Sequence, residues 1–207
     1  MYLATVPYFI KLFFPSSLLW KINTSKKEIF LTFDDGPVPE VTPWVLDTLD
    51  EYQAKATFFM VGENVARYPD LISEIQNRGH AIGNHSYNHI KGWKTSDTEY
   101  YANIEEAAKH IPATLFRPPH GQIRPHQARY LLNKYKIVMW SILTGDYDPS
   151  KTPEECFNNV RKNLKPGAIV VFHDSLKAEK NMKPALEESL NYLVENGWGF
   201  GMIEENF

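Results

Sequence analysis

The sequence has almost no cysteine and no strongly charged tract. Cys156 is the only cysteine among 207 residues, so no disulfide can form within the chain, and this usage fits a reducing compartment. The formal net charge is only −3 and no basic run occurs, which argues against nucleic acid as a partner. Hydrophobic residues make up 43% of the chain and aromatic residues 14%, so we expect one ordered globular domain.

The first 20 residues also lack the features of an export signal. No Lys or Arg precedes Lys11, which itself interrupts the apolar stretch, and no small-residue cleavage site follows. The stretch is too short and too interrupted to be a transmembrane segment. We therefore predict no transmembrane segment and assign no firm localisation, although the absence of a signal peptide favours the cytoplasm.

Residues 1–27 are expected to form an N-terminal helical cap on the domain. Val6, Phe9, Ile10 and Phe13 have the spacing of one helical face, which would pack on the rest of the chain. Attachment to a membrane surface is the alternative. The basic face that is typical of membrane-surface helices is missing from this segment.

Strand-like and helix-like segments alternate after residue 27, which indicates a parallel sheet with right-handed crossovers. Candidate chemical residues follow the ends of five strands, and this favours a closed or nearly closed barrel over an open sheet. The fold class is therefore α/β with a TIM-like barrel of about seven parallel strands. The expected strands are 28–33, 56–61, 80–84, 114–117, 136–142, 168–173 and 198–203, and the expected helices are 40–52, 63–78, 97–110, 125–134, 153–163 and 181–196.

Two adjacent aspartates, Asp34 and Asp35, end the first expected strand. Gly36 and Pro37 then turn the chain, so both carboxylates should lie at the tip of the strand. Two close carboxylates repel each other and need a counter-charge, which a metal on one and an arginine near the other would supply. A solvated turn is the alternative interpretation, because Asp-Gly-Pro sequences are common in turns.

His85 and His89 are four residues apart, which is about one helical turn. Their imidazoles could therefore converge on one ion. Such a pair also occurs by chance on helices, and it gains weight here from the aspartates. One Asp and two His ligands leave coordination positions open for water and substrate, which is the arrangement of a metal-assisted hydrolase.

The segment from Arg117 to Gly121 has a restricted backbone followed by a free turn. Its two prolines fix an extended conformation, and glycine permits the turn that follows. This arrangement can aim the His120 backbone N–H at an oxyanion, while Arg117 could orient one of the aspartates. The alternative is a proline-rich loop with a surface arginine.

His173 ends the apolar strand at 168–173, and Asp146 is its natural partner. A nearby carboxylate raises the pKa of a histidine and favours the proton-donating form. A core or capping histidine is the alternative. Trp93, Trp140 and Tyr147 are candidates for stacking on a sugar ring, although each could equally be a core residue.

These motifs together resemble the polysaccharide deacetylase family, also called carbohydrate esterase family 4 or the NodB-homology domain. The resemblance covers about residues 28–203 and includes TFDDGP at 32–37, HxxxH at 85–89 and RPPxG at 117–121. It implies a distorted (β/α) barrel in a domain at 28–207. It also implies the removal of N-acetyl groups from N-acetylglucosamine-containing glycans, such as peptidoglycan or chitin-like oligomers, with release of acetate.

The resemblance also implies a role for each matched residue. The implied cofactor is a divalent metal, with zinc first and Co²⁺, Mn²⁺, Ni²⁺ or Fe²⁺ as alternatives, and the implied partner is an acetylated glycan; the oligomeric state is not predicted. The implied roles are general base for Asp34; metal ligands for Asp35, His85 and His89; orientation of the base for Arg117; general acid for His173, supported by Asp146; and substrate contacts for His120, Trp140, Tyr147 and Val171.

Several positions depart from the pattern of the family. His120 stands where tyrosine is common, Leu143 where many members carry aspartate, Tyr147 where tryptophan is usual and Val171 where leucine usually lines the acetyl-methyl pocket. These changes leave two alternatives open. The same site could act on an O-acetyl ester or on a small amide or formamide, or the chain could bind glycan without turnover. The intact candidate ligands and acid–base residues argue against the second alternative.

Overall fold

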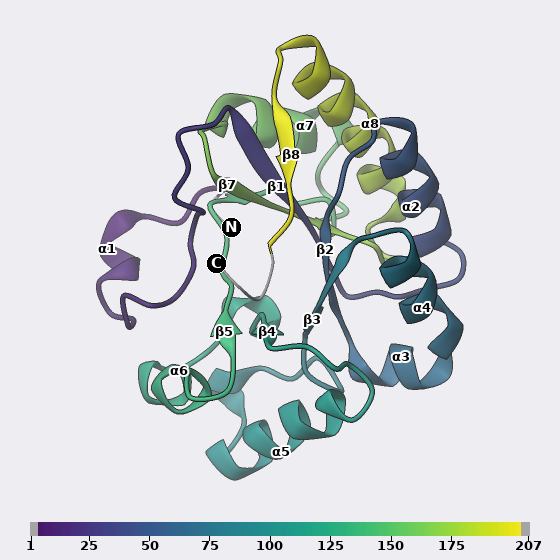
Figure 1. The fold of residues 1–207 in the computed structure, drawn as a ribbon. Coiled ribbons are helices and arrows are strands. Elements are labelled where there is room, and N and C mark those ends of the chain that lie inside the picture. The colour runs from purple at the N-terminus through teal and green to yellow at the C-terminus, as the bar shows by residue number, and fades with distance from the viewer. Residues whose placement is uncertain (1–3, 204–207) are drawn as a thin grey trace.

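A curled sheet of parallel strands forms the centre of the molecule (Figure 1). The computed structural model describes residues 4–203, so residues 1–3 of the expected cap and 204–207 of the expected domain lie outside the described residues. The strand order is β5-β4-β3-β2-β1-β7-β6, and β8 pairs with β1. The strands are β1 (Glu28–Asp34), β2 (Thr57–Met60), β3 (Ala81–Asn84), β4 (Leu115–Phe116), β5 (Lys136–Ile137), β6 (Ile142–Leu143), β7 (Ala168–His173) and β8 (Gly199–Gly201).

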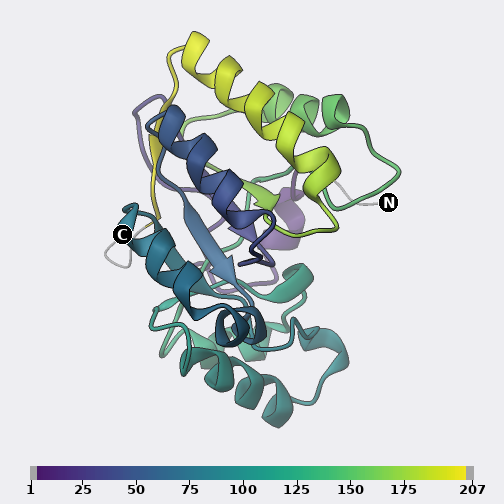
Figure 2. The same ribbon diagram turned by 90° about the vertical axis from the view of Figure 1, so that its right-hand side faces the viewer.

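Helices surround the outside of this sheet, and Figure 2 shows α2, α4 and α8 side by side on one face of the molecule. Within residues 4–203, no helix has the length and apolarity needed to cross a membrane. The helices are α1 (Tyr8–Lys11), α2 (Thr42–Glu51), α3 (Gly62–Arg67), α4 (Pro69–Asn77), α5 (Asp97–Ala108), α6 (Pro125–Leu131), α7 (Pro153–Asn163) and α8 (Glu179–Glu195), with short 3₁₀ helices η1 (Gly92–Lys94) and η2 (Pro119–Gly121).

The predicted distorted (β/α) barrel is confirmed, but the expected strand at 136–142 is wrong. Two short strands, β5 and β6, occupy its ends and lie at the two edges of the sheet. Between them, the carbonyl oxygens of Val138 and Met139 accept hydrogen bonds from the Arg117 side chain, at 3.2 and 3.0 Å. The backbone is thus turned toward a buried side chain, and the chain crosses from one edge of the sheet to the other.

The expected helix at 63–78 is also two helices. α3 ends before Tyr68, whose backbone is not helical (φ −130°, ψ 62°), and Pro69 begins α4. Proline is favoured at the first position of a helix and disfavours helical conformation in the residue before it. The break therefore follows from the Tyr68–Pro69 pair.

Residues of the N-terminal segment lie in the gap between the two edges of the sheet. The Leu19 N–H donates to the Ile137 carbonyl oxygen at 2.9 Å, and the Met139 N–H donates to the Leu19 carbonyl oxygen at 2.7 Å. The Ile22 N–H donates to the Gly167 carbonyl oxygen at 2.8 Å, next to the start of β7. The segment therefore bridges β5 and β7 where the barrel would otherwise be open.

The helical face predicted for the cap does not pack as expected. α1 has only four residues, and the side chains of Phe9 and Phe13 are 63% and 71% exposed. The segment instead packs on the domain through Leu18 and Ile22, which are buried in its apolar clusters, and Phe14 and Trp20 pack against the cluster that holds Leu18. A helix of one turn offers too little surface to bury the whole apolar face.

Side chains along β1 alternate between the outer core and the inner face of the curled sheet. Ile29, Leu31 and Phe33 pack in the core between the sheet and the outer helices. Phe30 faces the other way, into the apolar cluster within the curl of the sheet. Side chains two residues apart share one face of a strand, so Asp34 lies on the inner face, at the C-terminal end.

Candidate active site

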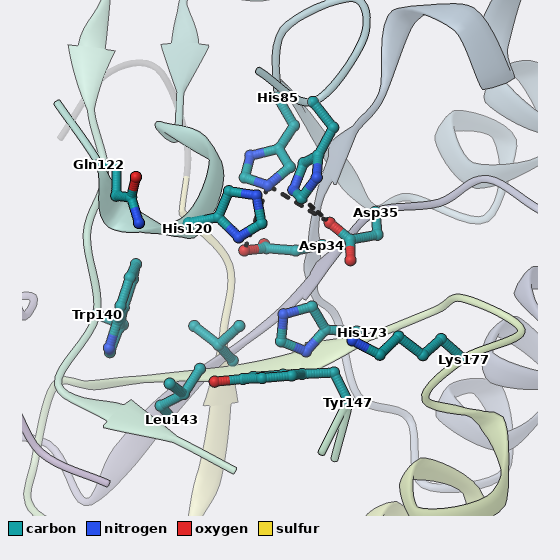
Figure 3. A pocket seen from close by; sticks show the side chains of 12 residues that line it. Asp34, Asp35, His85, His120, Gln122, Trp140, Leu143, Tyr147, His173 and Lys177 are labelled. Carbon is teal, nitrogen blue, oxygen red and sulfur yellow. Dashed lines mark ion pairs between the residues drawn. The ribbon is translucent and has the colours of Figure 1, made fainter. Parts of the chain in front are cut away.

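A pocket of about 470 Å³ lies at the C-terminal ends of the strands (Figure 3). Nine of the residues predicted for the site line it, and the other two, Arg117 and Asp146, are buried directly behind it. The structure thus brings together side chains from all parts of the chain after residue 33. The lining residues are Asp34, Asp35, His85, His89, His120, Gln122, Trp140, Leu143, Tyr147, Val171, His173 and Lys177.

Asp35, His85 and His89 form a cluster whose potential ligand atoms all lie within 4.8 Å of one another. Asp35 Oδ1 is 3.0 Å from His89 Nε2 and 3.6 Å from His85 Nε2. Two ligands at zinc-bonding distance from one ion in tetrahedral geometry lie about 3.4 Å apart. The three side chains are therefore spaced as ligands of one small cation.

The hydrogen bond at the far side of the His85 ring fixes which nitrogen faces the pocket. His85 Nδ1 lies 2.7 Å from the carbonyl oxygen of Arg117, which can only accept, so Nδ1 carries the proton. Nε2 therefore presents its lone pair to Asp35 and His89. Burial lowers the pKa of His85 to about 4 and outweighs the charge of Asp34, which raises it. The ring is therefore neutral, as metal binding requires.

The Asp35 carboxylate contains a buried oxygen without a donor. Oδ1 accepts no hydrogen bond among the described residues. Burial raises the pKa of Asp35, but the imidazoles of His89, His173 and His85 outweigh this effect and lower the pKa below its usual range. A buried, ionised oxygen with no donor, facing two imidazole nitrogens, fits a divalent cation.

The prediction that His85 and His89 lie one helical turn apart is wrong, because both lie in a loop after β3. Ser86 and His89 have positive φ angles of 62° and 55°, in the left-handed region that non-glycine residues rarely adopt. Asp35 and His120 share this conformation, with φ angles of 78° and 58°. Such strain gathers at functional sites, where surrounding structure holds the backbone in place. The histidines converge through loop geometry.

Asp34 is paired with Arg117 beneath the cluster. Arg117 Nη1 donates to Asp34 Oδ1 at 2.6 Å and also to Thr32 Oγ1 at 2.7 Å. The guanidinium is fully buried and lies over the Phe59 ring, 4.1 Å from its centroid. Asp34 Oδ2 is 3.9 Å from His85 Nε2. One carboxylate oxygen is thus held by the arginine, and the other faces the metal-ligand cluster.

His173 and Asp146 form the second acid–base pair. His173 Nδ1 lies 2.7 Å from Asp146 Oδ1, and the His173 backbone N–H donates to Asp146 Oδ2 at 2.7 Å. Burial lowers the pKa of His173, but the charge and hydrogen bond of Asp146 outweigh it and raise the pKa to about 9. The ring therefore carries a proton at neutral pH, and its Nε2–H is free to face the pocket.

The two pairs lie side by side because of the sheet register. Asp34 of β1 is the register partner of His173 of β7. Neighbouring parallel strands are about 4.8 Å apart, and register partners present their side chains on the same face. A carboxylate and a protonated imidazole therefore flank the same point of the pocket.

Apolar and aromatic side chains form the wall below these groups. Figure 3 shows Trp140, Leu143 and Tyr147 on the side of the pocket opposite His85. The Tyr147 ring packs edge-on against His173, with centroids 4.9 Å apart. Trp93, the other aromatic candidate, does not line the pocket; it is 56% exposed and its Nε1–H donates to the Ile123 carbonyl oxygen.

Sequence reasoning missed Gln122 and Lys177 in the pocket, and it assigned no role to Asp174, whose carboxyl lies behind the pocket. Asp174 Oδ1 accepts the Gly36 N–H at 3.1 Å, and Oδ2 accepts the Thr42 hydroxyl at 2.7 Å. Burial raises the pKa of Asp174 to about 8. A Cβ at Gly36 would lie 2.0 Å from Asp174 Oδ2, so this contact requires glycine in the turn. The position of Asp174 directly after His173 was the available signal.

Relatives of known name share much of this sequence. The family model for polysaccharide deacetylase matches residues 21–140. A peptidoglycan-N-acetylglucosamine deacetylase of Bacillus cereus is 37% identical over 195 residues, which cover 90% of this chain and 91% of the relative. Peptidoglycan-N-acetylglucosamine deacetylase PgdA of Listeria monocytogenes is 34% identical over 206 residues, and these span 94% of this chain but 42% of that longer protein.

Solved structures agree with this relationship. The crystal structure of the Bc1960 peptidoglycan N-acetylglucosamine deacetylase, in complex with a naphthalenyl N-hydroxybenzamide, has a TM-score of 0.86 and 30% identity, and the match covers 96% of this chain and 95% of that one. BA3943 of Bacillus anthracis, described as a pseudoenzyme of carbohydrate esterase family 4, has a TM-score of 0.79 and 26% identity over 89% of this chain and 66% of that one. This chain belongs to the polysaccharide deacetylase family, carbohydrate esterase family 4.

Proposed function

We propose that this protein is a metal-dependent hydrolase that removes the N-acetyl group from N-acetylglucosamine units of a glycan, with peptidoglycan as the first candidate. One observation carries the proposal. A three-residue ligand cluster shares a single pocket with a carboxylate held by an arginine and with an imidazole whose protonated form a second carboxylate stabilises. The names of the Bacillus and Listeria relatives support the substrate class.

Asp35, His85 and His89 would hold the metal, with zinc the first expectation from the two imidazoles and one carboxylate. Once bound, a divalent ion supplies Lewis-acid polarisation of the acetyl carbonyl and makes a water molecule more acidic. Among residues 4–203 this cluster provides three ligands, which leaves positions for water and substrate. The hydrogen bond from His85 Nδ1 to the Arg117 carbonyl keeps that ring in the ligating tautomer.

Asp34 is suited to act as the general base. Arg117 holds Oδ1, while Oδ2 faces the ligand cluster and can take a proton from the attacking water. Water then adds to the acetyl carbon. The His120 backbone N–H, in the turn that Pro118 and Gly121 frame, is the candidate donor to the oxyanion.

His173 is suited to act as the general acid. Its pKa of about 9 keeps Nε2 protonated at neutral pH. Transfer of that proton to the amide nitrogen allows the carbon–nitrogen bond to break, which releases acetate and a free amino sugar. Asp146 holds the ring by Nδ1 and stabilises its charged form. Trp140 and Tyr147 offer faces for the sugar ring, and Val171 lines the pocket where the acetyl methyl would lie.

The test is acetate release by zinc- or cobalt-loaded protein, with and without chelator. The panel contains N-acetylglucosamine oligomers, peptidoglycan, acetylxylan and simple formamides. Chelator-sensitive acetate from an N-acetyl substrate is the expected result. Asp34→Asn should lose at least about a hundredfold in rate while still binding metal, because a general base contributes 10²–10⁴-fold.

Each alternative has its own outcome in this panel. Release from acetylxylan alone would assign the site to O-acetyl esters, and release of formate alone would assign it to formamides. Glycan binding without any product under every metal would assign the chain to the non-catalytic class, as for the wild-type BA3943 pseudoenzyme. Near-full activity of Asp34→Asn would contradict the assignment of the base.

A further inference from the structure

A second pocket, of about 400 Å³, lies at the other end of the sheet from the catalytic pocket. It is lined by the N-terminal segment together with residues that precede β6 and β7. Ala168, the first residue of β7, lines this pocket, and His173, the last residue of β7, lines the catalytic one. At about 3.3 Å per residue, the two are about 17 Å apart along the strand.

Three lysines gather at this second pocket. Lys11 comes from α1, Lys21 from the segment in the barrel gap and Lys165 from the turn before β7. No carboxylate lines the pocket, and no ion pair of these lysines occurs within residues 4–203. Burial, and then the charge of Lys21, lower the pKa of Lys11. The fold therefore concentrates positive charge in a protein whose net charge is −3.

Exposed apolar side chains flank one of these lysines, Lys11, along the chain. Phe9, Leu12 and Phe13 are 63%, 68% and 71% exposed, in or directly after α1. Figure 1 shows α1 standing clear of the other helices, on the side of the barrel away from α2 and α4. Lys11 lies among these side chains in the sequence and also lines the basic pocket, so it joins the two features. We call these three apolar residues and the three lysines the cap patch.

We propose that the cap patch docks the protein on an anionic phospholipid bilayer, with Phe9, Leu12 and Phe13 in the boundary between headgroups and acyl chains and Lys11, Lys21 and Lys165 facing the lipid phosphates. Apolar side chains flanked by lysines are the composition of segments that bind at such interfaces. The helical stretch of the cap has no basic face of its own, but the fold brings Lys21 and Lys165 to the same pocket as Lys11. Docking at this end leaves the catalytic pocket open to glycan.

The charge pattern favours lipid over a second copy of this chain. A symmetric dimer through the cap patch would bring the lysines of both copies together, and like charges at short distance oppose association. An anionic lipid surface neutralises them. Aromatic and leucine side chains are also suited to the boundary region of a bilayer.

The experiment is flotation of the full chain with vesicles of phosphatidylglycerol and phosphatidylcholine, compared with vesicles of phosphatidylcholine alone. Binding should require the anionic lipid and should weaken as salt rises, because salt screens exposed charges. Equal binding to both vesicles, or no binding to the anionic ones, would overturn the proposal.

Two matched pairs of variants locate the binding surface. Lys11→Gln/Lys21→Gln/Lys165→Gln should lower affinity by about a hundredfold, or about fivefold for each lysine near an anionic surface. Lys109→Gln/Lys134→Gln/Lys180→Gln removes the same charge from exposed positions elsewhere and should change affinity less than about threefold. Equal losses in both triples would indicate only net charge and would overturn the proposal.

The apolar residues are tested in the same way. Phe9→Ser/Phe13→Ser should lower vesicle affinity at least about tenfold, whereas Leu176→Ser/Val194→Ser, at two other exposed apolar positions, should not. Deacetylase activity on a soluble oligomer and the melting temperature should stay unchanged in all variants, which separates docking from catalysis and folding. Loss of a concentration-dependent dimer in Phe9→Ser/Phe13→Ser, with vesicle binding intact, would overturn the proposal in favour of a second copy.

Discussion

His85 and His173 are both buried at the same pocket, yet they hold opposite protonation states. His85 Nδ1 faces the Arg117 carbonyl oxygen, and its pKa is lowered to about 4. His173 Nδ1 faces the Asp146 carboxylate, and its pKa is raised to about 9. Burial opposes the charged form of both rings, so the group opposite Nδ1 decides the difference. A carbonyl leaves a neutral ring for a metal, and a carboxylate leaves a proton to donate.

A third buried histidine, His80, shows what burial does without a carboxylate opposite Nδ1. It lies outside the pocket, where its Nδ1 accepts the Ala56 N–H at 3.2 Å and its buried Nε2 has no hydrogen-bond partner within residues 4–203. Burial and then the charge of Lys55 lower its pKa to about 4. A low pKa therefore does not by itself identify a ligand. The lone pair must also face other ligand groups, as it does for His85.

The largest effect is expected from removing the neutral ring. His85→Ala deletes one of three ligands, and activity should fall at least about a thousandfold, because metal catalysis supplies several kcal/mol. Zinc affinity, measured by competition with a chromophoric chelator, should fall in parallel. Activity that survives in His85→Ala with zinc still bound would contradict the ligand assignment. His80→Asn, at the buried histidine outside the pocket, is the control and should retain metal and activity.

Removing the carboxylate opposite His173 should have the next largest effect. In Asp146→Asn the imidazole loses the charge that holds its proton, so kcat should fall by about 10²–10³. Zinc affinity should stay within about twofold, since Asp146 is not in the ligand cluster. Loss of zinc together with activity in this variant would contradict the separation of the two histidine roles.

The pH profile sharpens the same comparison. The His173 proton is present below a pKa of about 9, so the rate should stay high through neutral pH and fall about tenfold per unit above 9. In Asp146→Asn the ring loses the charge and hydrogen bond that raise its pKa most, while burial still lowers it and only the charges of Asp35 and Asp34 still raise it, so the alkaline limb should move to lower pH. Profiles of kcat from pH 5 to 10 for both proteins check this. An unchanged alkaline limb in the variant would exclude His173 as the acid.

The smallest effect concerns stability and His80. Its folded-state pKa of about 4 lies below the unfolded value of about 6.5, so the unfolded chain binds more protons between these values. The free energy of unfolding should therefore fall as pH drops from about 6.5 to 4. His80→Asn keeps an acceptor for the Ala56 N–H but cannot be protonated, so urea midpoints should show a shallower pH slope than for wild type.

The sequence indicated the barrel and most of the pocket because both depend on local patterns. β-branched and aromatic runs marked the strands, and polar residues directly after them marked the C-terminal edge where the side chains converge. Asp34, Asp35 and His173 are of this kind, since strand ends place them. The register that pairs Asp34 with His173 follows from the sheet and was not visible in either segment alone.

The predictions failed where distant parts of the chain decide local structure. The segment 136–142 has a strand pattern, but the buried guanidinium of Arg117 takes two of its carbonyl groups. His85 and His89 have helical spacing, but positive φ angles at Ser86 and His89 bring them together in a loop. Lys177 enters the pocket from the segment before α8, and no motif marked that position.

The Leu19–Met139 contact joins two segments that are far apart in the sequence. Leu19 pairs with residues almost 120 positions later, and Ile22 pairs with Gly167, so these contacts carry a high entropy cost of loop closure. The Met139 carbonyl that these contacts help to place also accepts a hydrogen bond from Arg117. During synthesis, the segment with Leu19 and Ile22 can therefore pair only after residues 137–167 have been made. The hydrogen bond that Arg117, which orients Asp34, donates to Met139 also forms only then.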